Sequence, residues 1–225
     1  MVVLQNITMV THMKYSEAFL TGCDEKTEWM LPWFFENYKK HNKHPVVLAN
    51  FGMSDKMLKY ATDNAHAIMD LSKWKGKGWF LKPKSMNHCP AQKTVWIDTD
   101  CEVKGDLSKI FKHIEPERLS MVEDKPWTQR RKEIWHNSGV VGFQDKPTIL
   151  KMWQQQVEAD PVVGDQEVLH SMLNPITKMT YIKDLPHKYN VLRIDLLDGR
   201  VPEDPAIIHW TGKKGKDEIR RQMNA

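Results

Sequence analysis

The chain has 225 residues, of which 40% are apolar and 28% are charged, and its formal net charge is +4. This usage is ordinary for a globular protein with one sizeable core, and no apolar stretch approaches the roughly 18 residues that a membrane span requires. The small positive charge permits anionic ligands without indicating nucleic acid, and three cysteines without paired spacing indicate free thiols in a reducing cytoplasm.

Alternating strand-like and helix-like segments in the first half of the chain predict parallel βαβ units. The apolar N-terminus has no charged leader, so we expect a first strand there rather than a signal peptide. Thr27 and Ser54 are suited to cap the two helices that follow. The expected strands are residues 7–13, 45–51, 65–71 and 94–98, and the expected helices are residues 27–40 and 55–64.

Shorter strands and loops in the second half predict a mixed sheet with irregular connections. Pro147 is suited to the first turn of a helix. The expected helices are residues 106–113, 147–158 and 164–173, and the expected strands are residues 118–123, 139–143, 178–183, 191–194 and 206–209. Together the two halves indicate an α/β fold.

The strand expected at residues 94–98 runs into Asp98-Thr99-Asp100. Side chains alternate along a strand, so the two carboxylates converge on one spot. Two such charges repel each other unless a cation lies between them, and carboxylate oxygens suit Mg²⁺, Mn²⁺ or Ca²⁺. We therefore expect a metal site at this strand end, although Asp-Thr-Asp is also common turn chemistry.

His209 follows a second apolar run and precedes a segment of glycines and lysines. Its imidazole could be the third ligand of the same metal ion. Gly212, Lys213, Lys214 and Lys216 could surround a diphosphate, because backbone N–H groups and ammonium groups both bind anions. The structural alternative is a core histidine followed by a solvated basic tail.

Four further motifs contain residue types that bind sugars or anions. Asn137-Ser138 precedes a strand, and Asp165-Gln166 starts a helix, where Asp165 could equally be a simple cap. Lys82 lies sixteen residues before Asp98 and is by default a surface lysine. The segment 127–132 combines tryptophan with basic residues; it suits a lid or a patch for an anionic acceptor, but a solvated loop is the default interpretation.

The order of these motifs resembles that of the GT-A-fold nucleotide-sugar glycosyltransferases, with the closest likeness to the glycogenin and lipopolysaccharide galactosyltransferase group. The resemblance covers roughly residues 7–216. It implies a single Rossmann-like GT-A domain over residues 1–225, with a mixed sheet flanked by helices. Its nucleotide-binding part would span about residues 1–105 and its acceptor-side part about residues 106–225.

The resemblance also implies roles for individual residues. Asp98, Asp100 and His209 would bind Mn²⁺ or Mg²⁺, and Asp165 and Gln166 would lie beside the reacting carbon as catalytic residues. The donor would be bound by Thr11, His12, Lys82, Asp98, Thr99, Asn137, Ser138, Gly212, Lys213, Lys214 and Lys216. One departure is clear: the group usually has H-x-x-G-x-x-K-P-W after the late histidine, whereas Gly215 stands at the lysine position here and no Pro-Trp follows.

We therefore expect a metal-dependent, retaining glycosyltransferase that moves a hexosyl or pentosyl group from a nucleoside-diphosphate sugar to an acceptor hydroxyl. The acceptor remains open among polysaccharide, lipopolysaccharide, protein and a modified DNA base. One alternative is a haloacid-dehalogenase-like phosphatase with Asp98 as nucleophile, although about ninety residues precede the motif that normally opens such a domain. Another is a non-catalytic module that only binds nucleotide sugars.

Overall fold

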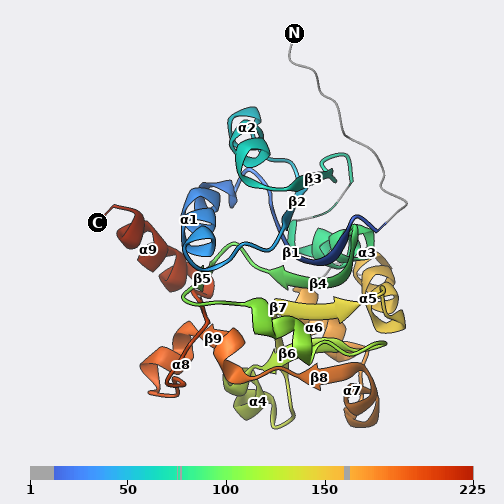
Figure 1. Cartoon of the computed structure of the whole chain (residues 1–225). Helices are drawn as coiled ribbons and strands as arrows, with labels where there is room; N and C mark the ends of the chain where they lie inside the picture. The colour runs from blue at the N-terminus through green and yellow to red at the C-terminus, as the bar shows by residue number, and fades with distance from the viewer. Residues whose placement is uncertain (1–12, 75, 77, 160–162, 225) are drawn as a thin grey trace.

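The computed structural model describes residues 13–74, 76, 78–159 and 163–224. Its main feature is a seven-stranded sheet in the order β3-β2-β1-β4-β7-β6-β8, with helices on both faces (Figure 1). The first four of these strands are parallel, whereas β7 runs antiparallel to both β4 and β6. The strands of this sheet are β1 (Tyr15–Cys23), β2 (Val46–Asn50), β3 (Ala67–Asp70), β4 (Ala91–Ile97), β6 (Leu119–Glu123), β7 (His136–Gln144) and β8 (Ile182–Asp184).

The strand β1, which lies between β2 and β4, was not predicted from the sequence. The strand expected at residues 7–13, with Thr11 and His12, lies outside the described residues except for Met13, which is exposed and precedes β1. Local propensity is weak in β1, because its first half carries polar side chains. Pairing with β2 on one side and β4 on the other stabilises it, and that context overrides propensity.

The helix expected at residues 55–64 is confirmed, whereas the one expected at residues 27–40 begins as a 3₁₀ turn and is α-helical only from Leu31. The Thr27 side chain makes no capping hydrogen bond, and the helices at residues 78–81 and 82–88 were not predicted. The side chain of Ser54 accepts a hydrogen bond from the backbone N–H of Met57 at 3.3 Å and so caps α2. The helix expected at residues 106–113 is present as a tighter 3₁₀ helix, η3. The helices of this half are η1 (Glu28–Met30), α1 (Leu31–His41), α2 (Asp55–Asn64), η2 (Gly78–Leu81), α3 (Lys82–His88) and η3 (Ser108–His113).

Two strands expected in the second half are largely helical. Residues 175–181 form α7, because Asn174 caps the backbone N–H of Thr177 and Pro175 suits the first turn, so only residues 182–183 of the strand expected at 178–183 are strand. The strand expected at 191–194 ends at Leu192, where α8 begins. The helices here are α4 (Lys125–Arg131), α5 (Thr148–Ala159), α6 (Asp165–Ser171), α7 (Pro175–Tyr181), η4 (His187–Tyr189), α8 (Arg193–Leu197) and α9 (Gly212–Met223).

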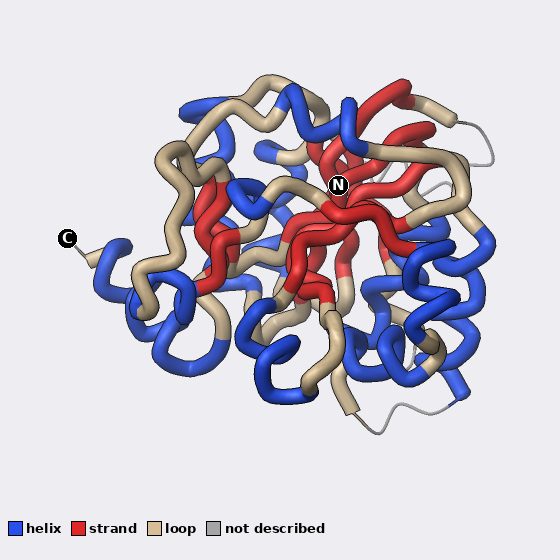
Figure 2. Tube along the Cα trace, turned by 90° about the horizontal axis from the view of Figure 1, so that it is seen from below, coloured by secondary structure: helices blue, strands red, loops and turns tan. Residues whose placement is uncertain are grey.

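A second, three-stranded sheet lies beside the first and was not predicted. Its strand order is β5-β10-β9, and the pairing of β10 with β5 joins residues from Ile207↔Val103 to His209↔Cys101, which lie far apart in the chain. The basic segment after it is a helix, α9, which leads to the C-terminus at the side of the molecule (Figures 1 and 2). Its strands are β5 (Cys101–Val103), β9 (Val191–Leu192) and β10 (Ile207–His209).

Apolar side chains on the two faces of the main sheet form two halves of the core. Phe19 and Val95 pack toward α1 and η3, whereas Leu20 and Trp96, the next residues along the same strands, pack toward α3 and α5. The chain is thus one α/β domain with a mixed sheet between helices, as predicted. Among the described residues, no helix has both the length and the apolar character needed to cross a bilayer.

Candidate active site

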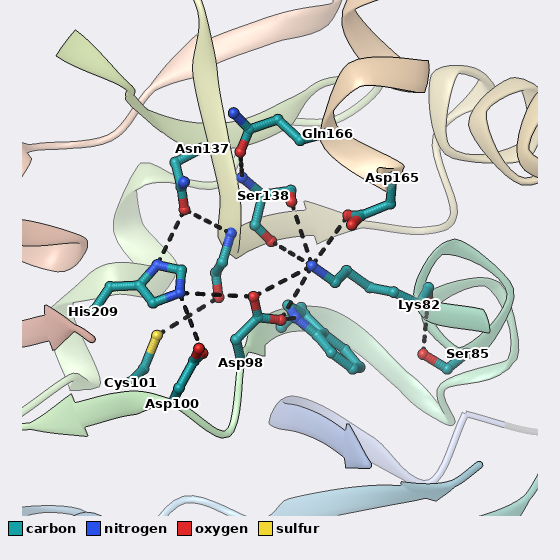
Figure 3. A network of polar contacts seen from close by, with 12 residues as sticks. Lys82, Ser85, Asp98, Asp100, Cys101, Asn137, Ser138, Asp165, Gln166 and His209 are labelled. Carbon is teal, nitrogen blue, oxygen red and sulfur yellow. Dashed lines mark hydrogen bonds and ion pairs between the residues drawn. The ribbon is translucent and has the colours of Figure 1, made fainter. Parts of the chain in front are cut away.

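Most of the predicted site residues converge at one end of the main sheet, where β4 stops and β7 starts. Asp98 and Asp100 directly follow β4, and β7, which runs in the opposite direction, brings Asn137 and Ser138 to the same end. The small sheet places His209 at the end of β10, and the first residues of α3 and α6 add Lys82 and Asp165. Figure 3 shows these side chains pointing toward one another. The ends of these strands and helices therefore bring together side chains that lie in separate segments of the sequence.

Lys82 is the centre of this cluster, which corrects its default interpretation as a surface lysine. Only 3% of the residue is exposed. Its ammonium Nζ lies 3.1 Å from Asp98 Oδ1 and 3.1 Å from Asp165 Oδ2. It also donates to the carbonyl oxygen of Ser138 at 3.2 Å. A buried ammonium requires such partners, and here it neutralises part of the acidic charge.

The two aspartates and His209 face one another. The Nε2 atom of His209 lies 3.2 Å from Asp100 Oδ1 and 3.9 Å from Asp98 Oδ2. Each carboxylate is also held from its other side: Trp96 donates to Asp98 Oδ1 at 2.6 Å, and Lys216 reaches Asp100 Oδ2 at 2.9 Å. One oxygen of each aspartate therefore remains directed toward the imidazole.

Amide oxygens fix the other edge of the His209 ring. Its Nδ1 atom lies 3.2 Å from Asn137 Oδ1 and 3.1 Å from Asn190 Oδ1. Because these are acceptors, Nδ1 carries a proton, and Nε2 faces the carboxylates, where it can take a proton or a metal ion. Gly139 leaves room for the ring, since a Cβ atom there would lie 2.1 Å from His209 Cε1.

These donors fit a hard divalent ion. Two carboxylates and an imidazole suit Mn²⁺ or Mg²⁺, and the amide oxygens behind His209 are the kind of outer support that metal-binding histidines use. Single ligand atoms of Asp100, Cys101 and His209 lie within 4.8 Å of one another. Burial raises the pKa of the Cys101 thiol, so Asp98 is the better third ligand for a hard ion.

Burial and charge shift the acidity of the cluster in different directions. Burial raises the pKa of Asp98, and Lys82 offsets this effect only in part. Burial also pushes the pKa of Asp100 upward, but the imidazole of His209 and the ammonium of Lys216 outweigh it and hold that pKa well below its usual range. Burial alone would lower the pKa of Lys82, but Asp165 and Asp98 raise it above the ordinary value.

A second polar network, which includes two residues that the sequence did not single out, lies behind the cluster. Asp124, 2% exposed, accepts hydrogen bonds at Oδ2 from the amides of Asn137 (3.1 Å) and Gln166 (3.2 Å). The amide oxygen of Gln166 in turn accepts from the backbone N–H of Ser138 at 3.1 Å. The position of Asp124 just after an expected strand was a usable signal. Asn190 lies in a loop and offered no comparable signal.

The lysines after His209 separate into one that reaches the site and two that do not. Lys216 reaches Asp100, whereas Lys213 and Lys214 are exposed, and Lys213 pairs with Asp217 on the surface of α9. Gly215 packs its backbone on residue 210, where a Cβ atom would lie 2.0 Å from the carbonyl oxygen of Trp210. A lysine therefore cannot occupy position 215 in this geometry, and the next residue supplies the cation.

The converging groups line a pocket of about 430 Å³. Thr99, Gly212 and the site residues above belong to its wall, while Lys213 and Lys214 do not. At the end of β1, where Thr11 and His12 were expected to meet the nucleotide, the wall is formed by Gly22, Cys23 and Asp24. A pocket of this size, with apolar walls and a few fixed polar groups, is typical of small-ligand sites.

Sequence comparison identifies no relative: no family model matches the chain, and no curated protein does. Comparison with solved structures finds the galactosyltransferase LgtC, in complex with donor and acceptor sugar analogs, at 13% identity and a TM-score of 0.65, covering 92% of this chain and 94% of LgtC. The glycosyltransferase GlyE of Streptococcus pneumoniae TIGR4 matches at 17% identity and a TM-score of 0.63, covering 88% of this chain and 55% of GlyE.

The bifunctional glycosyltransferase WbbM matches at 12% identity and a TM-score of 0.61, covering 89% of this chain and 46% of WbbM. This chain thus spans about half the length of WbbM and GlyE and nearly all of LgtC. Its fold is that of the GT-A glycosyltransferases. At these identities the likeness shows the fold, and the activity has to be argued from the site.

Proposed function

We propose that this protein transfers a sugar from a nucleoside-diphosphate donor to an acceptor hydroxyl. The observation that carries the proposal is the meeting of Asp98, Asp100 and His209 in one pocket of a GT-A fold. Two ammonium groups pair with these aspartates, from the buried Lys82 and the half-buried Lys216. In the proposed reaction the bond between the anomeric carbon and the diphosphate oxygen breaks, and its electron pair stays on the diphosphate. The acceptor oxygen forms the new bond to that carbon and releases its proton.

The roles follow from where each side chain lies. Asp98, Asp100 and His209 would hold Mn²⁺ or Mg²⁺, which when bound would neutralise the negative charge of the diphosphate. Lys216 lies at the helix start beside Asp100 and is the lysine that we assign to the leaving diphosphate. Asn137 and Ser138 line the pocket together with Thr99 and Gly212, and we assign them to donor binding.

Asp165 and Gln166 are assigned to the sugar. The Asp165 carboxylate is paired with Lys82, which makes it a weaker nucleophile but leaves a negative charge beside the carbon that becomes positive during transfer. Gln166 is fixed through both ends of its amide and can orient the sugar. We further propose that the reaction retains the configuration of the anomeric carbon and that the donor carries a hexosyl or pentosyl group. The proposal also divides the chain near residue 105 into a nucleotide-binding part and an acceptor-side part. Three free buried cysteines support a cytoplasmic location.

The fold speaks against the phosphatase alternative. Asp98 follows β4, with three strands of the same sheet before it in the chain, and β4 pairs antiparallel with β7. In such phosphatases the Asp-x-Asp motif lies near the start of the domain, whereas in this chain it lies in the middle of the domain. The non-catalytic alternative differs from the proposal only in turnover and is an outcome of the experiment.

The experiment is a screen of nucleoside-diphosphate sugars with and without Mn²⁺, read by thermal stabilisation and by release of nucleoside diphosphate. We expect one donor to raise the melting temperature only when Mn²⁺ is present and to be slowly hydrolysed. Asp100→Asn should lose both effects, whereas Asp217→Asn, on the exposed surface of α9, should keep them. Binding without hydrolysis or transfer would favour the non-catalytic module, and Mn²⁺-independent binding would contradict the metal assignment.

A further inference from the structure

The aromatic and basic segment 127–132 is the one sequence motif that the proposed reaction does not use. It forms most of α4, not a solvated loop, and α4 lies beyond β6 at the lower side of the molecule in Figure 1. Trp127 and Arg130 line the same pocket as Gln166 and Glu167. The segment is therefore part of the wall of the candidate active site.

The position of α4 relative to the reacting groups is fixed by Asp124. One oxygen of this carboxylate accepts the backbone N–H of Trp127 at 3.1 Å and caps the helix. Its other oxygen accepts from Asn137 and Gln166, which we assign to the donor. One buried side chain thus joins the helix to the donor site, so that groups on α4 are held at a constant distance from the transferred sugar.

Stacked rings make this wall stiff. Trp127 stacks on Trp135 with ring centroids 5.0 Å apart, and Trp135 stacks on His170 at 4.3 Å. His170 is buried and accepts the backbone N–H of His136 at 2.9 Å, which anchors the stack in the core. The outermost ring, that of Trp127, is half-buried at the pocket, and the guanidinium groups of Arg130 and Arg131 lie over it.

Arg130 and Arg131 differ from the other arginines of the chain. Their guanidinium carbons lie 5.1 and 4.9 Å from the centre of the Trp127 ring, and both residues are exposed. Within the described residues neither side chain makes a hydrogen bond or an ion pair. Each of the remaining arginines has a carboxylate or carbonyl partner: Arg118, Arg193, Arg200, Arg220 and Arg221. Two ordered guanidinium groups beside the pocket therefore have all of their N–H donors available.

We propose that α4 forms the acceptor subsite and that it selects an acceptor saccharide carrying an oxyanion, a phosphate or a carboxylate, near the hydroxyl that receives the sugar. The proposal rests on the proposed function. A guanidinium group held flat on an indole presents its N–H edges in the planar fork that matches such oxyanions. The indole itself offers a flat apolar surface at the pocket for the sugar ring.

The test compares three acceptors that share one ring: glucose, glucuronate and glucose 6-phosphate. Binding is measured by calorimetry without donor, and transfer is measured with the donor found in the screen above. We expect at least one of the two anionic sugars to bind and react about tenfold or more better than glucose, which corresponds to one charge-assisted contact. The carboxylate and phosphate arms then distinguish the two oxyanions.

Variants locate the subsite. Arg130→Gln with Arg131→Gln should remove the preference for the anionic sugars, measured as the ratio of anionic sugar to glucose in binding and in transfer. Arg220→Gln is the matched control, because Arg220 also lies over a tryptophan, Trp29, at 4.4 Å but outside the pocket wall. Equal use of glucose, an unchanged preference in the double variant, or transfer to an oligonucleotide but to none of the saccharides would overturn the proposal.

The two proposals can fail separately. Calorimetric binding of an anionic sugar that depends on Arg130 and Arg131 would support the subsite even if no donor were hydrolysed. Hydrolysis of a donor without any anionic preference would support sugar transfer and overturn the subsite. Circular dichroism of the double variant checks that the protein is still folded without the two guanidinium groups.

Discussion

Replacing Gly139 with alanine should displace His209 and thereby abolish metal-dependent donor binding. The added Cβ atom would lie 2.1 Å from His209 Cε1 and 2.4 Å from its Nδ1 atom. Heavy atoms in contact normally lie about 3.5–4.0 Å apart, so the ring has to move by more than about 1 Å. Metal–ligand distances tolerate shifts of only about 0.2 Å, so His209 would be lost as a ligand.

The expected effects on affinity and on stability differ in size. Loss of mere outer support costs about 10–100-fold in metal affinity, so displacement of the ligand itself should cost at least that much. Overpacking the buried strand β7 should lower the free energy of unfolding by about 1–3 kcal/mol, or about 2–4 °C in melting temperature per kcal/mol. The variant should therefore remain folded while losing its response to Mn²⁺.

Gly142→Ala is the matched control on the same strand. A Cβ atom there would lie 3.0 Å from Cγ1 and 3.2 Å from Cδ1 of Ile114, so the neighbour has to yield by only a few tenths of an ångström. Calorimetric titration of Mn²⁺ and nucleoside diphosphate into both variants measures the difference, and urea unfolding measures stability. A folded Gly139→Ala variant with wild-type Mn²⁺ affinity would refute His209 as a metal ligand.

Three further predictions concern buried and half-buried charges. Lys82→Met leaves Asp98 and Asp165 without their shared ammonium and should lower the free energy of unfolding in urea by about 3–5 kcal/mol. The control Lys84→Met removes a surface ion pair with Glu158 and should lower it by about 1 kcal/mol or less. Equal losses of stability in the two variants would contradict the buried pair. Lys216→Met should lower kcat/KM for the donor about 10–100-fold, while Lys214→Met should leave it unchanged. An unchanged kcat/KM in the Lys216 variant would show that another residue contacts the leaving diphosphate. Burial lowers the pKa of His170 to about 4, and the unfolded imidazole titrates near 6.5, so stability should be full above pH 6.5 and fall by about 3 kcal/mol as the pH drops toward 4. Urea unfolding across this range should show a shallower dependence on pH in His170→Gln, and an identical dependence would exclude His170 as the source.

Residues with a strong local signal were predicted well. Ser54 and Asp55 mark the start of α2 because a cap acts on the next turn of backbone and needs no distant partner. The apolar runs in β2 and β4 were sufficient to place both strands, and Asp98 and Asp100 could be assigned to a strand end from spacing alone. The same local logic failed at residues 178–183, where the cap at Asn174 decides for helix.

Elements whose stability comes from distant contacts could not be predicted. The strand β1 exists because β2 and β4 lie on either side of it. The first five residues of α9 are two glycines and three lysines, a poor helical sequence by propensity, yet Ile219 is fully buried in the core. In both segments tertiary packing outweighs a weak local preference.

The amino-acid sequence alone determined which chemical groups this protein has, among them the two aspartates after a strand and the late histidine. It also determined where one helix begins, at the cap formed by Ser54. Only the tertiary structure decided that Lys82 is buried between two carboxylates, that Lys216 rather than Lys213 or Lys214 faces Asp100, and that Asp124 joins α4 to the donor site. The physical reason is the distance along the chain over which each interaction acts. Capping and alternation act over a few residues, whereas burial, ion pairing and pocket shape depend on segments that only folding brings together.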